Sequence, residues 1–225
     1  MHKKQVCPCT LFKCPLCKTI PSDQHEEFCN DLRYNIKEYN KGELIIAQGA
    51  PTTHMYLVTT GCITTEMADE KGEPVRIEEM NAPSTLACGV LFADDNTSPV
   101  AAYAKTNTIV MAIPKDNVCQ LMTKYPAFMR AYLEQMSNKV AHLSERLRLA
   151  SLRTIRAKVA YYLIRESHDR TTFALQSSKE ELSRLFGVSR PALVNVMMQM
   201  ADEGLIDVNG REIVIHRRNE LQRMF

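Results

Sequence analysis

The sequence predicts an α+β protein with an N-terminal antiparallel β barrel or sandwich, a long helix and a C-terminal winged helix-turn-helix. Short β-prone runs separated by turn residues fill the stretch from Ile36 to about Pro114. After Pro126, apolar residues recur at three- and four-residue steps. Near the C-terminus, two short helix patterns precede a hairpin signal. A chain of 225 residues is long enough for two domains of ordinary size.

The first segment, residues 1–35, is rich in cysteine. Cys7, Cys9, Cys14 and Cys17 form the pattern C-x-C-x4-C-x2-C, and Cys29 follows in a stretch whose apolar spacing predicts a short helix. A short polar stretch has no core in which to bury thiols. We therefore expect these cysteines to be paired, oxidisable or bound to a metal.

The composition indicates the cellular compartment of the protein and the kind of partner it binds. No apolar run approaches the ~18 residues of a membrane span, and the N-terminus lacks the apolar region of a secretory signal. We therefore expect a cytoplasmic protein without a membrane partner, and there clustered cysteines more often bind metal or do redox chemistry than form structural disulfides. Lys and Arg exceed Asp and Glu only after Ser151, a bias that permits nucleic-acid binding.

Residues 36–125 predict the barrel. Turn pairs such as Lys41-Gly42 and Thr60-Gly61 separate short strands, which is typical of an antiparallel barrel or sandwich. The expected strands lie around 44–46, 55–58, 62–65, 75–77, 100–103 and 108–111.

Residues 126–150 predict one long helix with an apolar seam. About 25 helical residues span ~37 Å, more than a small domain needs for its own packing. Such a seam usually meets a second copy or a partner, although a long core helix lying against the barrel fits the same pattern. The predicted dimerisation residues are Met129, Met136, Val140, Leu143, Leu147 and Ala150, with Leu133 in the same series.

Residues 151–225 predict an amphipathic helix over 153–164 and then a helix-turn-helix. Ser177 or Ser178 caps the first of the two short helices, Gly187 allows the turn, and Ser189 caps the second with Pro191 in its first turn. We expect Val194, Met197 and Met198 to bury the second helix. The stretch 204–215 reads as two strands around an Asn-Gly turn, the wing of a winged helix. An ordinary helical hairpin is the alternative, but caps, turn, burial pattern and wing in this order favour DNA binding.

From about Lys37 to Ile215, the chain resembles the Crp/Fnr family of bacterial transcription factors. The resemblance rests on three motifs: Lys41-Gly42-Glu43 with Gln48-Gly49, Tyr56-Leu57-Val58 with Gly61, and Phe186-Gly187-Val188-Ser189-Arg190. It implies a jelly-roll sensor barrel, a long dimerisation helix and a winged helix that binds promoter DNA as a homodimer. It also implies RNA polymerase as a protein partner.

Two departures from the family pattern matter. The cyclic-nucleotide branch holds its ligand with a Gly-Glu pair and an Arg-Ser pair, but here Cys88 stands at the Glu position and Ser98 at the Arg position. Without that cation we expect no cAMP binding. In the second helix, Pro191 replaces an acidic residue. We predict that Arg190 and Asn195 reach bases, that Ser178, Lys179 and Ser189 hold phosphates, and that Pro191 also lies at the DNA.

The resemblance implies an oxygen- or NO-labile [4Fe-4S] cluster for Fnr-like members, on N-terminal cysteines and one from the barrel. The spacing here departs from theirs, and the matching barrel position is Met111. Cys7, Cys9, Cys14, Cys17 and Cys29 are the candidate ligands, and an all-thiolate set suits a cluster or zinc. A thiol switch, a haem held by His54, His142 or Met111, and a small molecule in the barrel are alternatives. Cys62, Cys88 and Cys119 are expected to be buried packing residues.

No phosphate loop, nucleophile elbow or paired acid and base occurs in the sequence, so we predict a regulator and no enzyme. The predicted mechanism is a change at the cysteine loop that alters its packing near the barrel and the start of the long helix. That change would set the spacing of the two recognition helices in a dimer.

Overall fold

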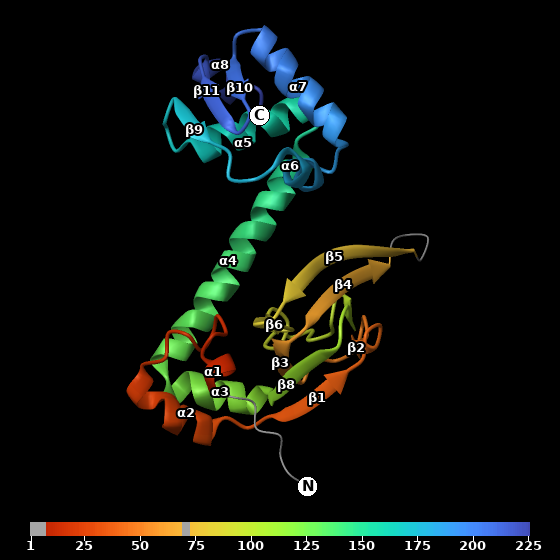
Figure 1. Cartoon of the computed structure of the whole chain (residues 1–225), viewed down its shortest axis with the longest axis vertical. Helices are drawn as coiled ribbons and strands as arrows, with labels where there is room; N and C mark the ends of the chain where they lie inside the picture. The colour runs from red at the N-terminus through yellow and green to blue at the C-terminus, as the bar shows by residue number, and fades with distance from the viewer. Residues whose placement is uncertain (1–7, 69–72) are drawn as a thin grey trace. The chain divides into compact units, whose positions relative to one another are not determined.

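The computed structural model describes residues 8–68 and 73–225, and the chain divides into two compact units (Figure 1). The first unit runs to Lys139 and the second begins at Val140. This division falls inside one helix, α4 (Pro126–Ser151), which matches the long helix predicted over 126–150. In the part of the chain that the structure describes, no helix is both long and apolar enough to cross a membrane.

The barrel consists of two antiparallel four-stranded sheets, in the orders β1-β8-β3-β6 and β2-β7-β4-β5. All six predicted strand runs lie in these sheets. The strand bounds are β1 (Asn35–Tyr39), β2 (Leu44–Ile46), β3 (His54–Thr60), β4 (Cys62–Ala68), β5 (Pro74–Asn81), β6 (Ser84–Leu86), β7 (Ala101–Ala104) and β8 (Thr108–Pro114).

Strands β1 and β6 were not predicted, because β1 is largely exposed and β6 has only three residues. Pairing places them: β1 runs antiparallel to β8, and β6 runs antiparallel to β3. A core of small and branched residues, including Ile45, Val58, Ile63 and Val110, fills the barrel. The sheets thus confirm the predicted antiparallel barrel.

The N-terminal segment and the helix after the barrel share a second core. Here lie α1 (Pro8–Leu11), the 3-10 helix η1 (Ser22–Gln24), α2 (His25–Asp31) and α3 (Lys115–Lys124). Leu11, Leu16, Ile20 and Phe28 are buried together with residues of β3, β8, α3 and the first turns of α4. The expectation that this stretch has no core for its thiols is therefore wrong, because apolar residues between the cysteines close a core against the barrel. We call this group the N-terminal core.

The second unit contains the predicted winged helix. Its elements after α4 are α5 (Ile155–Ser167), β9 (Thr172–Ala174), α6 (Lys179–Phe186), α7 (Arg190–Asp202), β10 (Ile206–Asn209), β11 (Glu212–Ile215) and α8 (Arg218–Gln222). The hairpin of β10 and β11 gains a third strand, β9, which sequence reasoning missed. Helix α5 begins at Ile155, two residues after the predicted start, because Thr154 accepts a hydrogen bond from the Ala157 N–H and caps it.

Candidate DNA-binding surface and cysteine site

Two serine caps and one glycine define the ends of α6 and the start of α7. The Ser178 hydroxyl accepts a hydrogen bond from the Glu181 N–H at 3.2 Å, and the Glu181 carboxylate accepts one from the Ser178 N–H at 2.7 Å. Gly187 ends α6 with φ +66°, a conformation that costs glycine little. Ser189 then accepts a hydrogen bond from the Ala192 N–H at 3.3 Å and caps α7. The predicted caps and turn are thereby confirmed.

Helix α7 has one buried face and one exposed face. Leu193, Met197 and Met200 are buried in the core of the second unit, whereas Met198 is 49% exposed. The prediction that Met198 helps to bury this helix is wrong. Met197 and Met200 are three residues apart and share a face, while Met198 points about 100° further around the helix.

The predicted DNA-contacting residues lie on the exposed side of the motif. Ser189, Arg190, Pro191 and Asn195 are exposed, and Ser178 and Lys179 are half-buried at the start of α6. Among the residues that the structure describes, none forms a hydrogen bond or ion pair with the side chain of Arg190 or Asn195. Both ends are therefore open to a ligand.

A hollow of about 420 Å³ joins this surface to the wing. Ser177, Ser178, Lys179 and Arg190 line it from the helix-turn-helix, and Gly210 and Arg211 line it from the turn between β10 and β11. Sequence reasoning missed Arg211. The Asn209-Gly210 hairpin signal could have found it, because the residue after such a turn begins the returning strand at the tip of the wing. Three cationic residues, together with Glu180, thus line one hollow.

The predicted metal ligands lie in different surroundings. Cys7 lies outside the described residues, and Cys9 belongs to α1. Cys14 and Cys17 follow in a turn closed by the Cys17 N–H, which donates to the Cys14 carbonyl at 3.0 Å. Both are buried in the N-terminal core, and Cys29, on α2, packs against that core.

The sulfurs of Cys14 and Cys17 interact directly. A hydrogen bond from the Cys17 thiol lowers the pKa of Cys14, although burial opposes the shift. The same bond raises the pKa of Cys17, and burial and the charges of Cys14 and Cys29 add to it. The shared hydrogen bond therefore makes Cys14 the more acidic of the two thiols. Within residues 8–68 and 73–225, however, no three Cys, His, Asp or Glu side chains are grouped closely enough to hold a metal ion.

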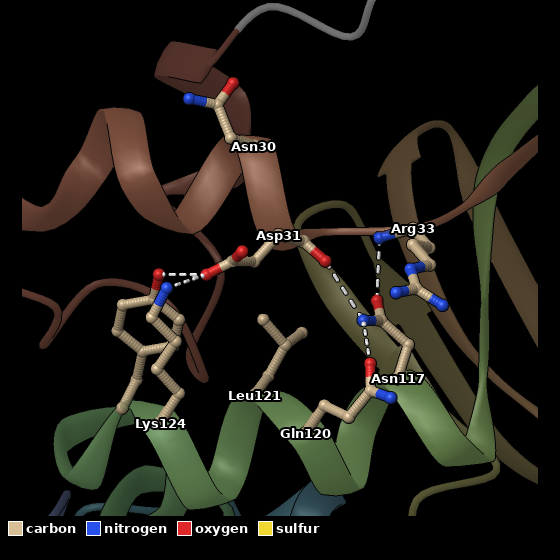
Figure 2. A pocket seen from close by; sticks show the side chains of 8 residues that line it. Asn30, Asp31, Arg33, Asn117, Gln120, Leu121 and Lys124 are labelled. Atoms are coloured by element: carbon tan, nitrogen blue, oxygen red, sulfur yellow. Dashed lines mark hydrogen bonds and ion pairs between the residues drawn. The ribbon is translucent and has the colours of Figure 1, made fainter.

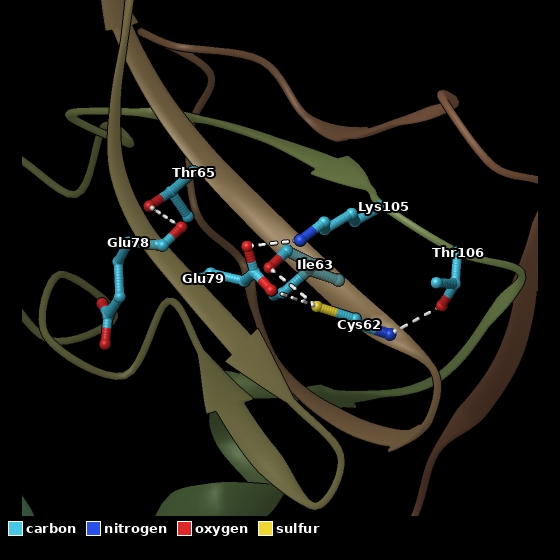
Figure 3. Close-up of polar contacts among 7 residues, drawn as sticks. All are labelled: Cys62, Ile63, Thr65, Glu78, Glu79, Lys105 and Thr106. Carbon is cyan, nitrogen blue, oxygen red and sulfur yellow. Dashed lines mark hydrogen bonds and ion pairs between the residues drawn. The ribbon is translucent and has the colours of Figure 1, made fainter.

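Two of the cysteines predicted to be packing residues are buried, and the third is not. Cys88 is buried in the N-terminal core, whereas Cys119, on α3, is exposed, so the prediction for Cys119 is wrong. Figure 3 shows Cys62 on β4, whose thiol donates to the Glu79 carboxylate at 3.7 Å, while Lys105 binds the same carboxylate at 2.6 Å. Burial and Glu79 raise the pKa of Cys62, so this thiol stays protonated and serves as a donor.

A polar contact fixes the end of α2 on α3, beside a cavity of about 270 Å³ (Figure 2). The buried Asn117 side chain accepts from the Arg33 N–H at 2.7 Å and donates to the Asp31 carbonyl at 3.0 Å. The Asp31 carboxylate accepts from Lys124 at 2.7 Å and from Tyr125 at 2.6 Å, which lowers its pKa. These contacts, which we call the α2–α3 latch, hold the helix that carries Cys29.

Helix α4 exposes most of its predicted dimerisation residues. Met129, Leu133, Val140, Leu143 and Leu147 are 40–72% exposed, and Ala150 is exposed as well. Met136 instead packs against the N-terminal core. Ala131 and Tyr132, on another face, are buried there, so the first turns of the helix do lie on the first unit as the alternative interpretation expected. The other five residues and Ala150 form an apolar seam on α4 that is exposed in the single chain.

Two of the alternative haem ligands, His54 and Met111, lie on neighbouring strands of the barrel. His54 pairs in register with Pro114 on the β3–β8 ladder, whereas Met111 pairs with Leu57, and His142 belongs to the second unit. Two positions correspond to those where the cyclic-nucleotide branch of the family holds its ligand. Here Cys88 is buried, and the Ser98 hydroxyl donates to the Val100 carbonyl at 2.7 Å. Ser98 therefore stabilises its own loop. The absence of cAMP binding stays a prediction.

Comparisons with known proteins agree with this architecture. Residues 36–125 match the cyclic nucleotide-binding domain family, and residues 157–224 match the Crp-like helix-turn-helix domain family. The transcriptional activator protein anr of Pseudomonas aeruginosa is 27% identical over 182 residues, covering 78% of this chain and 74% of its own. The cAMP-activated global transcriptional regulator CRP of Salmonella typhimurium is 21% identical over 188 residues, with 81% and 90% covered.

A solved structure shows the same fold along most of the chain. The catabolite activator protein of Thermus thermophilus aligns with a TM-score of 0.57 and 18% identity, covering 93% of this chain and 97% of its own. Both domains, in the family's order and joined by a long helix, are present in this one chain. The protein therefore belongs to the Crp/Fnr family and is a DNA-binding transcriptional regulator rather than an enzyme.

Proposed function

We propose that the protein binds promoter DNA as a two-fold homodimer and responds to oxygen, NO or redox state through a [4Fe-4S] cluster on its N-terminal cysteines. The observation that carries this proposal is the burial of Cys14 and Cys17 in a core that also contains the first turns of α4. A change at these sulfurs acts on side chains that touch the proposed dimer helix.

The DNA-binding part rests on the exposed face of the helix-turn-helix. Arg190 and Asn195 project from α7 and suit guanine and adenine edges in the major groove, with Pro191 beside them in the first turn. Ser178, Lys179 and Ser189 suit the phosphate backbone, and Arg211 adds a cation from the wing side of the same hollow. Two such units, related by a dimer axis, would contact half-sites about one helical turn apart.

The dimer rests on α4. An apolar seam whose side chains are 40–72% exposed is costly in water, and a second copy of the same helix would cover it. Met129, Val140, Leu143, Leu147 and Ala150 would lie at this contact. Met136 would connect it to the N-terminal core, against which it packs.

All the candidate donors are thiols, whose chemistry suits an iron–sulfur cluster, although the described ones are not grouped closely enough to hold it in this structure. Cys14 and Cys17 are neighbouring thiols, of which Cys14 has the lower pKa, and the charge of Cys29 helps to raise the pKa of Cys17. Cys7 and Cys9 precede them in the chain. When bound, such a cluster supplies a centre that oxygen or NO can alter. The protein's part is to hold the thiols, limit access of water by burial, and place the cysteine loop against α4.

Anaerobic reconstitution tests the sensing proposal most directly. We expect brown protein with stoichiometric iron and sulfide, and DNA affinity that changes on exposure to oxygen or NO. The C14S/C17S double variant should lose both the colour and the response, whereas C119S, which alters an exposed thiol, should keep them. A colourless wild type that binds zinc, or a response retained by C14S/C17S, would contradict the proposal.

A thiol switch is the second candidate, and one observation favours it. Cys14 and Cys17 are a hydrogen-bonded pair in which Cys14 has a lowered pKa, the arrangement of an attacking and a resolving thiol. It predicts a metal-free protein in which oxidation removes two free thiols and changes DNA affinity. The reconstitution experiment separates the candidates, because this one requires no bound iron or sulfide.

The DNA contacts are tested by substitution in the winged helix. R190A and N195A should each weaken promoter binding by about 1–3 kcal/mol and relax base preference at one position. R211A should weaken binding uniformly across sequences and lower the salt dependence by about one released ion. R223A, which removes an exposed arginine after α8, is the control. Wild-type binding by R190A and N195A would contradict the assignment.

A further inference from the structure

The exposed face of α7 carries an apolar side chain that belongs neither to the core nor to the proposed DNA contacts. Met198 is 49% exposed, whereas Met197 and Met200 of the same helix are buried. In residues 152–225, all of which the structure describes, Met198 is the one large apolar side chain that is exposed. Packing within the second unit therefore does not explain an apolar residue at this position.

Met198 lies on the same side of α7 as two of the proposed DNA contacts. Successive residues of a helix turn by about 100°, so Met198 lies about 20° from Pro191 and about 60° from Asn195 around the helix axis. All three residues are exposed. Leu193, which is fully buried, lies about 140° from Met198. A duplex that contacts Pro191 and Asn195 therefore also meets Met198.

The charge of this face limits what it can recognise. Residues 191–201 contain no Asp, Glu, Lys, Arg or His. In the major groove, Arg and Lys suit guanine, and Asp and Glu suit cytosine, whereas Asn and Gln suit adenine and apolar groups suit the methyl group of thymine. The exposed amides of Asn195 and Gln199 and the exposed thioether of Met198 thus suit A·T pairs rather than G·C pairs.

We propose that Met198 is a specificity-determining residue that contacts the C5-methyl group of a thymine in the major groove, in the base pair next to the one that Asn195 contacts. This inference rests on the proposed function, because it requires α7 to lie in the major groove. A flexible thioether side chain can adapt to a methyl group, which thymine presents there. Asn195 and Met198 are about 4.5 Å apart along the helix, and stacked base pairs are about 3.4 Å apart. The two side chains therefore reach neighbouring base pairs.

Replacement of thymine by deoxyuracil tests the contact directly, because it removes the C5-methyl group and keeps the base pairing. Full-length wild type first selects its half-site from a library of random duplexes. Each thymine of the selected site is then replaced in turn, at the equivalent position of both half-sites. Burial of one methyl group changes a binding constant by about fourfold. At one base pair from the adenine preference that N195A loses, the double replacement should therefore weaken wild-type binding about 16-fold.

Variants of Met198 identify the side chain that makes the contact. M198A should bind the thymine and deoxyuracil sites with equal affinity, and M198L should retain part of the difference because leucine is also apolar. M67A is the matched control, since Met67 is 37% exposed but lies on β4 of the first unit. It should keep the wild-type difference. Affinity for duplexes without the site should be the same in all four proteins, because a methyl contact carries no charge.

The outcomes separate this inference from the proposed function. If wild type selects no sequence and binds all duplexes equally, the proposed base contacts and this inference are both wrong. If wild type selects a half-site but no deoxyuracil replacement beside the N195A position weakens binding, this inference is wrong and the DNA-binding face of α7 stands. The same holds if M198A keeps the wild-type difference. Loss of the difference in M67A would also overturn the inference, because the effect would then not depend on α7.

Discussion

The helix-turn-helix and the cysteine segment are both short stretches with strong sequence signals, but different kinds of contact hold them. In the helix-turn-helix, Ser178 and Ser189 bond to backbone groups three residues away. In the cysteine segment, Asn117 binds the backbone at Asp31 and Arg33, and Cys14 shares a core with Cys88. The caps and turn of the recognition motif are thus set by near neighbours, while the cysteine segment packs against strands and helices far from it along the chain. A change at Cys14 or Cys17 would therefore disturb that unit's core.

Phe28→Ala should have the largest effect and should act on the N-terminal core. Phe28 is fully buried, and its ring lies 5.0 Å from that of Tyr125 and 5.6 Å from that of Phe128. Removing it leaves a cavity between α2 and α4, which should cost about 3–5 kcal/mol in the free energy of unfolding of the first unit. Chemical denaturation measures the loss in the free energy of unfolding, and hydrogen exchange of peptides from α2 and α3 shows where protection is lost. F92A, whose ring is 40% exposed, is the control and should cost less.

Equal protection loss in α6 and α7 peptides of F28A would contradict the comparison. It would mean that the helix-turn-helix depends on the N-terminal core as much as the cysteine segment does.

Asn117→Ala should loosen the α2–α3 latch. It leaves the Arg33 N–H and the Asp31 carbonyl without their side-chain partner, at a cost of about 1–3 kcal/mol if water does not replace it fully. We expect faster hydrogen exchange in α2 and a lower yield of reconstituted cluster, because α2 carries Cys29. Q120A is the matched control, since Gln120 contacts Asn117 only at 3.5 Å. Unchanged hydrogen exchange in α2 of N117A would show that the α2–α3 latch does not stabilise this helix.

Gly187→Ala should affect the DNA-binding side alone. An added Cβ meets nothing within 4 Å, so the cost comes from φ +66°, roughly 1–2 kcal/mol for a residue with a Cβ. DNA affinity should fall and exchange in α6 should rise, without a change in the metal content of the protein. G89A is the control, because Gly89 has neither a close contact nor a positive φ. A loss of cluster in G187A would show that the two regions are not independent.

The same contrast explains what the sequence could predict. Caps, the glycine turn and the Asn-Gly wing follow from neighbours along the chain, so the helix-turn-helix was predicted nearly residue by residue. Met198 was misplaced because an apolar residue beside Met197 looks equally buried until the helix face is known. Cys88 was correctly predicted to be buried, but that it shares a core with Cys14 depends on the barrel, which no local spacing encodes. Arg211 likewise joins Arg190 only once the wing has folded.

Acid should weaken the α2–α3 latch, with the smallest effect of the series. Hydrogen bonds from Lys124 and Tyr125 hold the pKa of Asp31 below its ordinary value. A carboxyl group with a lowered pKa in the folded state contributes stability above its unfolded pKa, about 3.9, and loses it as the pH falls through the folded value. Hydrogen exchange in α2, corrected for the intrinsic pH dependence of exchange, should therefore rise at acid pH relative to that in α6.

Asp31→Asn isolates this contribution, because Asn cannot titrate and keeps a similar volume. The variant should show weaker α2 protection at neutral pH and should lack the part of the acid loss that Asp31 causes, while α6 behaves as in wild type. The effect is small because the Asp31 side chain is 37% exposed and its pairing with Lys124 is screened by water. Helix α6 has an acid-sensitive group of its own, because bonds to Ser178 lower the pKa of Glu181, so the decisive comparison is between α2 of D31N and α2 of wild type at each pH. If D31N and wild type lose α2 protection over the same acid range, groups other than Asp31 set the acid sensitivity of α2. The contacts that hold α2 from far along the chain are then those of Asn117 and the N-terminal core.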